Sequence, residues 1–375
     1  MSTQHSTDLI VIGAGILGLA TAWRAHKQGR TVHVIERSDS PVGASIQNFG
    51  HACFTAQADD LQDLARSSAQ GWKEAARDAG LWAMQPGTVI PLQTETEKAV
   101  IEQFRAHRGG EDVVLLSPQA TRERLGAPAL DVLGGAHLPR DMRVNPRQAA
   151  PELAWWLHNQ GVRFSWNTAA WHTAGGVVET NRGTFRASEV VACPGERAGE
   201  MFPGVVDKHG VRTCTLTMAL IARPETTPVD LAMLTATSMT RYEGIAAMPA
   251  AERLRAELAA REPELVDNIA NVMATAIPGG ILVGDSHEYA LSPTPFIDAA
   301  QSELLLGRAA RYLGIECPVV LQRWQGRYAD SASTNLVLEH PDEATTVAVV
   351  TSGIGMTLSF GIAELIVNHE EAPAP

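Results

Sequence analysis

A glycine-rich turn near the N-terminus carries the clearest chemical signal in this sequence. Gly13, Gly15 and Gly18 follow a short apolar run in the pattern Gly-x-Gly-x-x-Gly. In this pattern the first glycine permits a tight turn, the second lets the backbone approach a pyrophosphate, and the third lets a helix pack close to a strand. Because N–H groups at the start of a helix bind anions, the turn is typical of a site for the phosphates of a dinucleotide.

The residues on either side predict the βαβ unit that must hold this turn. Leu9–Ile12 is predicted to be a buried strand, Leu17–Gln28 a helix and Thr31–Ile35 a second strand. Glu36 follows that strand, 18 residues after Gly18, where a carboxylate accepts hydrogen bonds from ribose hydroxyls. The combination predicts dinucleotide binding, although the same fingerprint serves NAD and FAD, and a glycine turn without a ligand is the alternative.

The loop that follows Glu36 favours an extended cofactor. Residues Pro41–His51 are rich in small and hydrogen-bonding side chains and do not lead straight into another helical crossover. Gly43, Ser45 and Asn48 fit a Gly-x-Ser-x-x-Asn-like motif. On these residues the sequence resembles the FAD-dependent oxidoreductases of the D-amino-acid oxidase, glycine oxidase and sarcosine oxidase family, and the resemblance implies FAD.

Later segments extend this resemblance along the chain. Arg143–Pro146 is predicted to open a helix, because proline is favoured in the first helical turn. Val162–Thr184 is predicted to form short strands, and the resemblance implies that Ala170 presents its backbone to the adenine. Glu189–Gly195 resembles the strand and turn that close the nucleotide site, although Cys193 could equally belong to the core.

The segment Ala348–Gly361 repeats the pattern of the first turn, with a strand, a glycine turn and a helix start. In the family, this helix start directs its N–H groups and positive dipole end at the flavin pyrimidine O2, where they stabilise the negative charge of the reduced ring. An ordinary packed turn is the alternative. Together the motifs and the resemblance imply these cofactor-binding residues: Gly13, Gly15, Ile16, Leu17, Gly18, Glu36, Arg37, Gly43, Ser45, Asn48, Phe49, Gly50, Ala170, Cys193, Gly195, Gly353, Ile354, Gly355, Met356 and Thr357.

The family has a discontinuous FAD-binding domain, and the resemblance implies the same division here. An α/β fold is expected, in which a Rossmann-like FAD-binding domain comprises residues 1–85, 143–212 and 320–375. An α+β substrate domain with a mainly antiparallel sheet would comprise residues 86–142 and 213–319. Its predicted strands are Thr88–Leu92 and Cys214–Ala222, and its predicted helices are Thr94–His107 and a stretch from Pro249 to about Ala276.

Five short blocks resemble one branch of this family, the FAD oxidoreductases associated with aminophosphonate breakdown in bacteria. The blocks are Asn48–Gly50, Arg241-Tyr242, Gly284–Tyr289, Arg323–Tyr328 and Gly355–Gly361. The branch implies oxidation of amines similar to 2-aminoethylphosphonate. The chain departs from the branch at His51, where an apolar residue is expected, so the pocket beside the flavin could differ.

Such a substrate carries an anionic head, and guanidinium groups match phosphonate and carboxylate oxygens well. We expect Arg241, Arg323, Arg327 and His287 to converge on this head as a cationic cluster. The alternatives are solvated or paired arginines, a tryptophan in the core, and neutralisation of His287 by Asp285 or Glu288. The candidate catalytic residues, which include further hydrogen-bond donors and a pocket wall, are His51, Arg241, Tyr242, His287, Tyr289, Arg323, Trp324 and Arg327.

The cysteines bear on cofactor attachment. Sarcosine oxidases tether their flavin to a cysteine in the segment that resembles Gln322–Tyr328, and that segment contains no cysteine here, whereas Cys317 lies upstream. The resemblance therefore implies non-covalent FAD. The four cysteines are far apart and form no C-x-x-C pair, so neither a disulfide framework nor a metal site is predicted.

Composition limits the partners. The net charge of −12 argues against nucleic acid or an anionic membrane surface as the main partner. The first eight residues predict no signal peptide, and the apolar stretch Leu9–Trp23 is shorter than the roughly 20 residues of a membrane span. We therefore expect a cytoplasmic protein, and the resemblance implies that its partners are a small anionic amine and oxygen or another electron acceptor.

The resemblance implies one reaction and leaves two alternatives. The expected reaction is oxidation of 2-aminoethylphosphonate or its N-methyl derivative to an imine, which hydrolyses to phosphonoacetaldehyde, while oxygen is reduced to hydrogen peroxide. The first alternative is an oxidase or dehydrogenase of glycine, sarcosine or a D-amino acid, which would share every cofactor motif. The second is a non-catalytic FAD-binding subunit of a hetero-complex.

Overall fold

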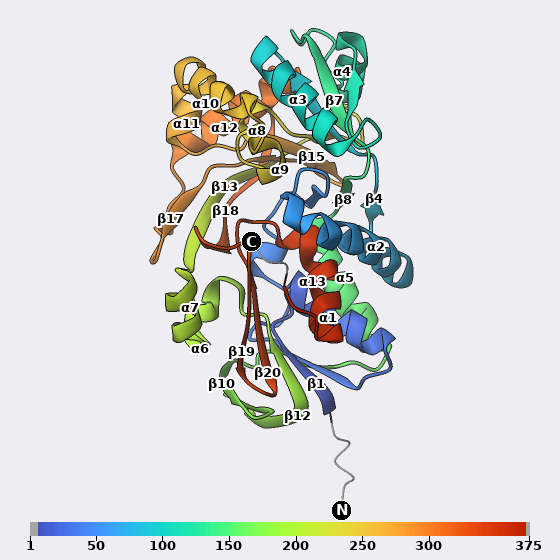
Figure 1. The fold of residues 1–375 in the computed structure, drawn as a ribbon, viewed down its shortest axis with the longest axis vertical. Helices are drawn as coiled ribbons and strands as arrows, with labels where there is room; N and C mark the ends of the chain where they lie inside the picture. Colours follow the sequence, from blue (N-terminus) through green and yellow to red (C-terminus); the bar gives the residue numbers. More distant parts are fainter. Residues whose placement is uncertain (1–6, 373–375) are drawn as a thin grey trace, which may run out of the picture.

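A computed structural model describes residues 7–372 of the chain, and two large sheets dominate it (Figure 1). Residues 1–6 lie outside the described range, so the expected absence of a signal peptide stays a prediction. None of the described helices combines the length and the apolar content that a membrane crossing requires.

The first large sheet has eight strands around a parallel centre. Its parallel strands run in the order β20-β12-β1-β2-β9, and antiparallel pairing adds β10, β11 and β19. Central strands are apolar because both faces of the sheet are covered. The strands are β1 (Thr7–Ile12), β2 (Val32–Ile35), β9 (Arg163–Ser165), β10 (Ala170–Ala174), β11 (Val177–Thr180), β12 (Gly183–Ala192), β19 (Leu336–Asp342) and β20 (Thr345–Val350).

Four helices form a layer beside this sheet, namely α1 (Ile16–Lys27), α2 (Gln62–Ala79), α5 (Pro146–Asn159) and α13 (Gly355–Asn368) (Figure 1). An aromatic cluster joins three of them, since the Phe360 ring centroid lies 5.5 Å from that of Trp23 and 4.7 Å from that of Trp72. Gly71 permits this packing, because a Cβ there would lie 2.6 Å from the Cβ of Phe360. The layer holds the starts of α1 and α13 in fixed positions.

The second large sheet has nine strands and lies in the upper half of the view (Figure 1). All of its pairs are antiparallel except that of β5 with β14. Its strands are β5 (Thr88–Leu92), β6 (Val114–Leu116), β7 (Gly134–Leu138), β13 (Arg212–Ile221), β14 (Ala232–Met233), β15 (Met273–Ile277), β16 (Gly280–Gly284), β17 (Glu288–Ala290) and β18 (Val320–Asp330).

The remaining helices lie mostly around this second sheet. Thr94 caps the helix that was expected after it, because its side chain accepts a hydrogen bond from the Glu97 N–H. The helices are α3 (Glu95–Arg108), α4 (Pro118–Leu125), α6 (Ala198–Met201), α7 (Pro203–His209), α8 (Ala236–Met239), α9 (Glu243–Ala246), α10 (Ala250–Arg261), α11 (Pro263–Asp267) and α12 (Ala299–Tyr312).

A small third sheet, β3 (His51–Ala52), β8 (Met142–Val144) and β4 (Ala83–Met84), lies where the chain crosses between the two large sheets. The Arg143 side chain of β8 is fully buried and donates hydrogen bonds to the carbonyl oxygens of Val229, Leu231 and Ala276. Arg143 therefore fastens the small sheet to segments of the nine-stranded sheet.

The observed architecture confirms the predicted α/β class with a mainly antiparallel second sheet. The expected helix from Pro249 to about Ala276 is wrong at its end, since helical structure stops at Asp267 and Met273–Ile277 forms β15, a fully buried strand. The domain boundaries stay a prediction. However, β18 pairs along its length with β13 of the nine-stranded sheet, although residues from 320 onward were expected in the FAD-binding domain.

Candidate active site

A single cavity of about 900 Å³ receives residues from both large sheets. One part of its lining consists of the first glycine turn, Glu36 and the loop around Gly43–Phe49. A second part consists of side chains of the nine-stranded sheet and of the segment around Arg241. The start of α13 also lines the cavity and adjoins the second part, since a Cβ at Gly353 would lie 3.2 Å from the Tyr328 Cζ. This volume lies in the upper part of the range that cofactor and ligand sites occupy, roughly 300–1,000 Å³.

The first glycine turn has the close approaches that its pattern predicts. A Cβ at Gly18 would lie 2.0 Å from the Gly13 carbonyl oxygen, so α1 packs directly on the turn. Gly13 has a φ of 103°, and a Cβ there would lie 2.6 Å from the Cys193 carbonyl oxygen. Gly15 lines the cavity, and apart from its chain neighbours the Ser45 hydroxyl is the one described atom within 4 Å of its Cβ position, at 3.2 Å. The turn thus leaves backbone exposed to a ligand at Gly15.

The Glu36 carboxylate is fixed at the edge of this turn. Its Oε2 accepts a hydrogen bond from the Ala14 N–H at 2.7 Å, and its Oε1 accepts one from the Ser38 N–H at 2.9 Å. Glu36 is 9% exposed and lines the cavity. Neighbouring Arg37 also lines the cavity and pairs with Glu200 at 3.0 Å. A buried, oriented carboxylate of this kind fits the ribose of an adenine dinucleotide.

The loop after β2 is held by its own side chains. The Ser45 hydroxyl accepts the Ile16 N–H of α1 at 2.8 Å, and the Asn48 amide donates to the carbonyl oxygens of Ala44 and Ser45. The Asn48 Oδ1 accepts the Gly50 N–H at 2.7 Å. These contacts support Gly43, Ser45, Asn48 and Phe49, all of which line the cavity.

Gly50 itself does not line the cavity and corrects one expectation. A Cβ at this position would lie 2.0 Å from the Val144 carbonyl oxygen, and the Gly50 carbonyl accepts the Val144 N–H at 2.8 Å. This glycine therefore serves close packing of the loop against β8 rather than cofactor contact.

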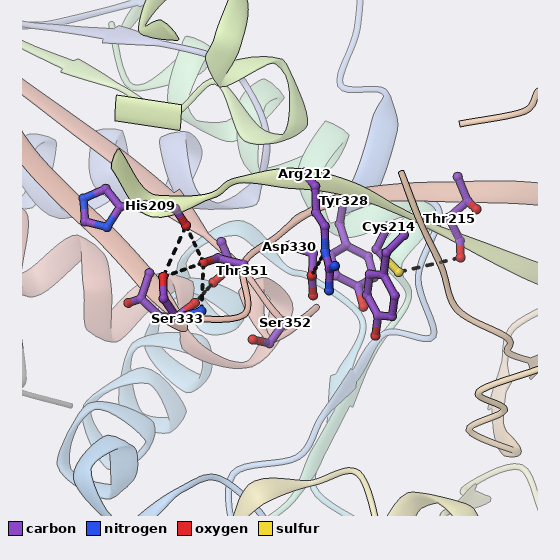
Figure 2. Close-up of polar contacts among 12 residues, drawn as sticks. His209, Arg212, Cys214, Thr215, Tyr328, Asp330, Ser333, Thr351 and Ser352 are labelled. Carbon is purple, nitrogen blue, oxygen red and sulfur yellow. Dashed lines mark hydrogen bonds and ion pairs between the residues drawn. The ribbon is translucent and has the colours of Figure 1, made fainter. Parts of the chain in front are cut away.

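The start of α13 forms the second glycine turn of the cavity. Residues Gly353–Thr357 all line it, as do Ala170, Cys193 and Gly195. The turn is held by the segment that precedes β19. The Ser352 hydroxyl contacts the Asn335 amide oxygen, and the Thr351 hydroxyl donates to the Thr334 carbonyl. Figure 2 shows Thr351 and Ser352 beside Ser333, whose hydroxyl donates to the His209 carbonyl at 3.2 Å.

Arg241 provides a positive charge in the second part of the cavity lining, the part that includes side chains of the nine-stranded sheet. Its Nη1 donates to the Tyr289 hydroxyl and its Nη2 to the Tyr328 hydroxyl, both at 3.1 Å. Within residues 7–372, no carboxylate oxygen lies within 4.0 Å of this guanidinium. Its charge is therefore oriented by neutral hydroxyls and is open to an anion.

The other two predicted arginines, Arg323 and Arg327, differ in whether they line the cavity. Arg327 lines the cavity and donates to the Gln325 side chain. Arg323 does not line it, and its guanidinium forms an ion pair with Glu303 at 2.5 Å. The expectation that all three arginines converge on the substrate head is wrong for Arg323. It lies four positions before Arg327 in the same strand, a distance of about 13 Å.

Trp324 also lies outside the cavity lining. Its indole N–H donates to the Gln47 carbonyl at 3.2 Å, and the Arg147 guanidinium lies 4.7 Å from its ring centroid. The alternative of a packing role fits these contacts better than a wall of the substrate pocket.

The two histidines line the cavity in neutral form. Burial lowers the pKa of His51 to about 3 and, with the nearby Arg241, lowers the pKa of His287 well below its usual range. His287 Nδ1 lies 2.9 Å from the Ile269 carbonyl, which can only accept, so Nδ1 carries the proton and Nε2 does not. The expectation that His287 adds positive charge is therefore wrong.

The proton-bearing nitrogen of His51 is also engaged in a hydrogen bond within the protein. Its Nε2 lies 2.6 Å from the Thr88 hydroxyl, and that hydroxyl donates to Asp141 at 2.6 Å. The His51 proton therefore lies on Nε2, and its Nδ1 is a buried acceptor that has no partner among residues 7–372. Contrary to expectation, His51 has no donor left for a substrate.

His51, Cys53 and Asp141 also form a buried group whose potential metal-ligating atoms lie within 4.8 Å of one another. The Asp141 oxygens already accept hydrogen bonds from Thr55 and Thr88, and burial raises the pKa of the Cys53 thiol well above its usual range. The Asp141 carboxyl is thus engaged by hydroxyl and N–H donors and the Cys53 thiol keeps its proton, so the group fits a metal ion poorly.

The part of the cavity lining around Arg241 also includes Tyr242, Tyr328 and Asp285. Within the described part of the chain, the partners of the Tyr242 hydroxyl are two sulfur atoms, of Cys53 at 3.5 Å and of Met273 at 3.7 Å, so this hydroxyl remains able to bind a stronger acceptor. Tyr328 and Asp285 were not among the predicted site residues, although both stand in quoted sequence blocks. Their roles depend on burial and on pairing across strands, which those blocks do not display.

Comparison with known proteins agrees with this geometry. A family model described as DAO, FAD dependent oxidoreductase, matches residues 8–369. Glycine oxidase from Geobacillus kaustophilus superposes with a TM-score of 0.76 at 20% identity, covering 97% of this chain and 95% of that chain. Iminodiacetate oxidase from Chelativorans sp. BNC1 gives a TM-score of 0.75 at 17% identity, covering 98% and 97%. At these identities the likeness concerns the fold.

Curated relatives match over shorter stretches. D-amino acid dehydrogenase from Helicobacter pylori is 49% identical over 43 residues, 12% of this chain and 10% of the relative. L-aspartate oxidase from Mycobacterium leprae is 32% identical over 102 residues, 26% of this chain and 18% of the relative. The chain thus spans less than a fifth of the length of these two relatives. The family model, in contrast, matches nearly the whole of this chain. The cavity and the family match together show that this chain belongs to the DAO family of FAD-dependent oxidoreductases.

Proposed function

We propose that this enzyme oxidises the C–N bond of a small anionic amine, with 2-aminoethylphosphonate or its N-methyl derivative as the substrate. The product is an imine that hydrolyses to phosphonoacetaldehyde, while oxygen is reduced to hydrogen peroxide. The observation that carries the proposal is Arg241, a guanidinium held by two tyrosine hydroxyls in the cavity wall without a carboxylate partner among the described residues.

The chain's own residues fit FAD. The exposed backbone at Gly15 and the start of α1 would bind the pyrophosphate, Glu36 the ribose, and the start of α13 the flavin end, where a positive helix terminus favours negative charge. FAD supplies the acceptor for the hydride equivalent that leaves the substrate carbon. Cys317 does not line the cavity, which supports non-covalent binding.

Arg241 is suited to select the anionic end of the substrate. A protein of net charge −12 repels anions on average, so a binding site for one needs a local cation. The two hydroxyls of Tyr289 and Tyr328 orient the guanidinium without neutralising it. Arg327 lies in the same cavity and would add a second charge for a dianionic phosphonate.

The rest of the pocket favours a neutral amine. Only a neutral nitrogen has the free electron pair that the oxidation requires, and a desolvated site beside a cation lowers the pKa of a substrate ammonium group. The buried, uncharged His51 and His287 and the tyrosines supply such surroundings. The pocket therefore binds the anionic head and favours loss of a proton from the bound amine.

One observation favours a second candidate, the oxidation of a carboxylate amino acid such as glycine, sarcosine or a D-amino acid. Arg323 lies outside the cavity, so Arg241 and Arg327 are the predicted arginines that remain in it. A single guanidinium fork suffices for a monoanionic carboxylate.

The deciding experiment is an amine panel on the purified flavoprotein. It compares 2-aminoethylphosphonate, its N-methyl derivative, glycine, sarcosine and D-alanine, with peroxide detection in one arm and an artificial electron acceptor in the other. The proposal expects the highest kcat/KM with an aminophosphonate. Faster turnover of the carboxylates would favour the second candidate, activity with the artificial acceptor alone would indicate a dehydrogenase, and no turnover would indicate a non-catalytic subunit.

A further inference from the structure

The carboxyl group of Asp285 lies in the cavity wall with an unsatisfied oxygen. The residue is 4% exposed, and its buried Oδ1 has no hydrogen-bond partner within residues 7–372. Its Oδ2 lies 3.8 Å from His287 Nε2, which is longer than a hydrogen bond. Burying an acceptor without a donor costs free energy, so such a group is a candidate for ligand contact.

The backbone fixes this carboxyl in place. The Asp285 N–H donates to the Asn271 carbonyl at 2.9 Å, and the Asn271 N–H donates to the Asp285 carbonyl at 2.8 Å. The Asn271 side chain is held in turn by the Ser238 hydroxyl at 2.6 Å. This reciprocal pairing joins the segments before β15 and after β16, so Asp285 is positioned by two strands.

Among the described residues, none of the neighbouring side chains donates a hydrogen bond to this oxygen. The titratable or charged groups that face Asp285 are Arg241, His287, Tyr242 and Cys214. Arg241 directs two of its N–H groups at tyrosine hydroxyls, and His287 carries its proton on the nitrogen that binds the Ile269 carbonyl. A ligand that enters the cavity can supply this donor.

We propose that Asp285 binds the ammonium group of the substrate and accepts its proton, while Arg241 binds the acidic head. This inference rests on the proposed oxidation of an amine. In the step, one N–H bond of the ammonium breaks and its electron pair stays on nitrogen, while the proton forms an O–H bond with the Asp285 carboxylate. The products are a neutral amine and a neutral carboxylic acid, so no net charge is created.

The acid–base properties of Asp285 agree with this role. Burial raises the pKa of Asp285 to about 7, although the nearby Arg241 acts in the opposite direction. A base with a pKa close to the working pH is present in its acceptor form and also releases its proton readily. His287 Nε2, which carries no proton, lies beside the carboxyl and suits its protonated form.

The test compares the wild type with Asp285→Asn, using whichever amine of the panel is oxidised fastest. The wild type should lose kcat/KM as the pH falls through about 7, because the carboxylate becomes protonated. Asp285→Asn should lower kcat/KM about 100-fold or more near pH 7, since general-base catalysis contributes about 10²–10⁴-fold. Its activity should recover as the pH rises toward the pKa of the substrate amine in solution.

A binding arm separates proton transfer from a structural role. Anaerobic calorimetry measures the affinity of the flavoprotein for the amine and for an anion without an amine, ethylphosphonate or propionate. Asp285→Asn should bind the amine-free anion at least as tightly as the wild type, because a negative neighbour of Arg241 is removed, and it should bind the amine at least 10-fold more weakly. Asp112→Asn is the matched control, since Asp112 pairs with Arg140 outside the cavity and should change neither profile.

The outcomes are distinguishable. Equal loss of both ligands in Asp285→Asn, or an unchanged acidic limb with kcat/KM within 3-fold of the wild type, would overturn the assignment. If only carboxylate amines are oxidised, the phosphonate proposal fails while the Asp285 test proceeds with glycine. If no amine is oxidised at all, the proposed function fails, and the binding arm alone decides whether Asp285 recognises an ammonium group.

Discussion

Replacement of Arg241 tests the feature on which the proposed function depends most. Arg241→Gln removes the charge and keeps a polar side chain of moderate length, whereas Arg241→Lys keeps the charge and removes the planar fork. In the wild type both Nη groups are oriented by tyrosine hydroxyls at 3.1 Å. A lysine has a single nitrogen and cannot reproduce this arrangement together with a two-point contact to the substrate.

The magnitude follows from the surroundings of the guanidinium. Two unit charges about 4 Å apart attract by about 4 kcal/mol at an effective dielectric constant of about 20. Truncating one partner of a desolvated charge pair costs about 2–5 kcal/mol in measured cases. Because about 1.4 kcal/mol corresponds to a factor of ten, Arg241→Gln should lower kcat/KM by about 30-fold to about 4,000-fold. Arg241→Lys should lose about 10-fold, since the charge remains.

The assay is steady-state turnover of the preferred amine, with flavin occupancy and thermal unfolding measured for every variant. Arg323→Gln is the matched control, because this arginine is exposed and paired with Glu303 outside the cavity. It should change kcat/KM less than about 2-fold, as expected for a surface ion pair. Equal losses in Arg241→Gln and Arg323→Gln, or a fully active Arg241→Gln, would refute the reasoning.

The remaining predictions concern cofactor retention and stability. Glu36→Ala should weaken FAD retention by about 1.5–3 kcal/mol while the fold persists, as equilibrium dialysis against free FAD would measure, and unchanged affinity would mean that Glu36 does not contact the ribose. Gly18→Ala should reduce flavin occupancy in the purified protein, because its Cβ would lie 2.0 Å from the Gly13 carbonyl oxygen, and full occupancy would contradict the close packing. Burial raises the pKa of Asp141 to about 6 from its ordinary 3.8, so the folded state binds more protons than the unfolded state between these pH values. The free energy of unfolding of the wild type, relative to Asp141→Asn, should therefore fall as the pH rises from about 4 to about 6, by up to about 3 kcal/mol in urea titrations, and a pH-independent difference would exclude this effect.

The sequence predicts best where one short segment determines the structure. The first glycine turn, its flanking strands and Glu36 lie within thirty residues, and their spacing sets their geometry. Gly50 shows the limit, since the same glycine signal arose from contact with a distant strand, β8.

Residues whose roles depend on distant segments were harder to predict. Arg323 and Arg327 look equivalent in the sequence, and only the position of β18 along β13 separates the one outside the cavity from the one inside it. Asp285 is one of many acidic residues, and its burial and missing partner depend on Asn271 and the elements packed around it. The strand Met273–Ile277 is composed of small and apolar residues with no alternation of polar ones, so its neighbours in the sheet decide its conformation.

Tyr328 touches two parts of the cavity that serve different purposes. Its hydroxyl accepts a hydrogen bond from Arg241, and its ring lies against Gly353, where an added Cβ would come within 3.2 Å of the Tyr328 Cζ. A mutation at either Gly353 or Tyr328 would therefore disturb both the guanidinium of Arg241 and the turn that begins α13. Substitutions at these two positions are therefore expected to change the substrate preference and the flavin environment together.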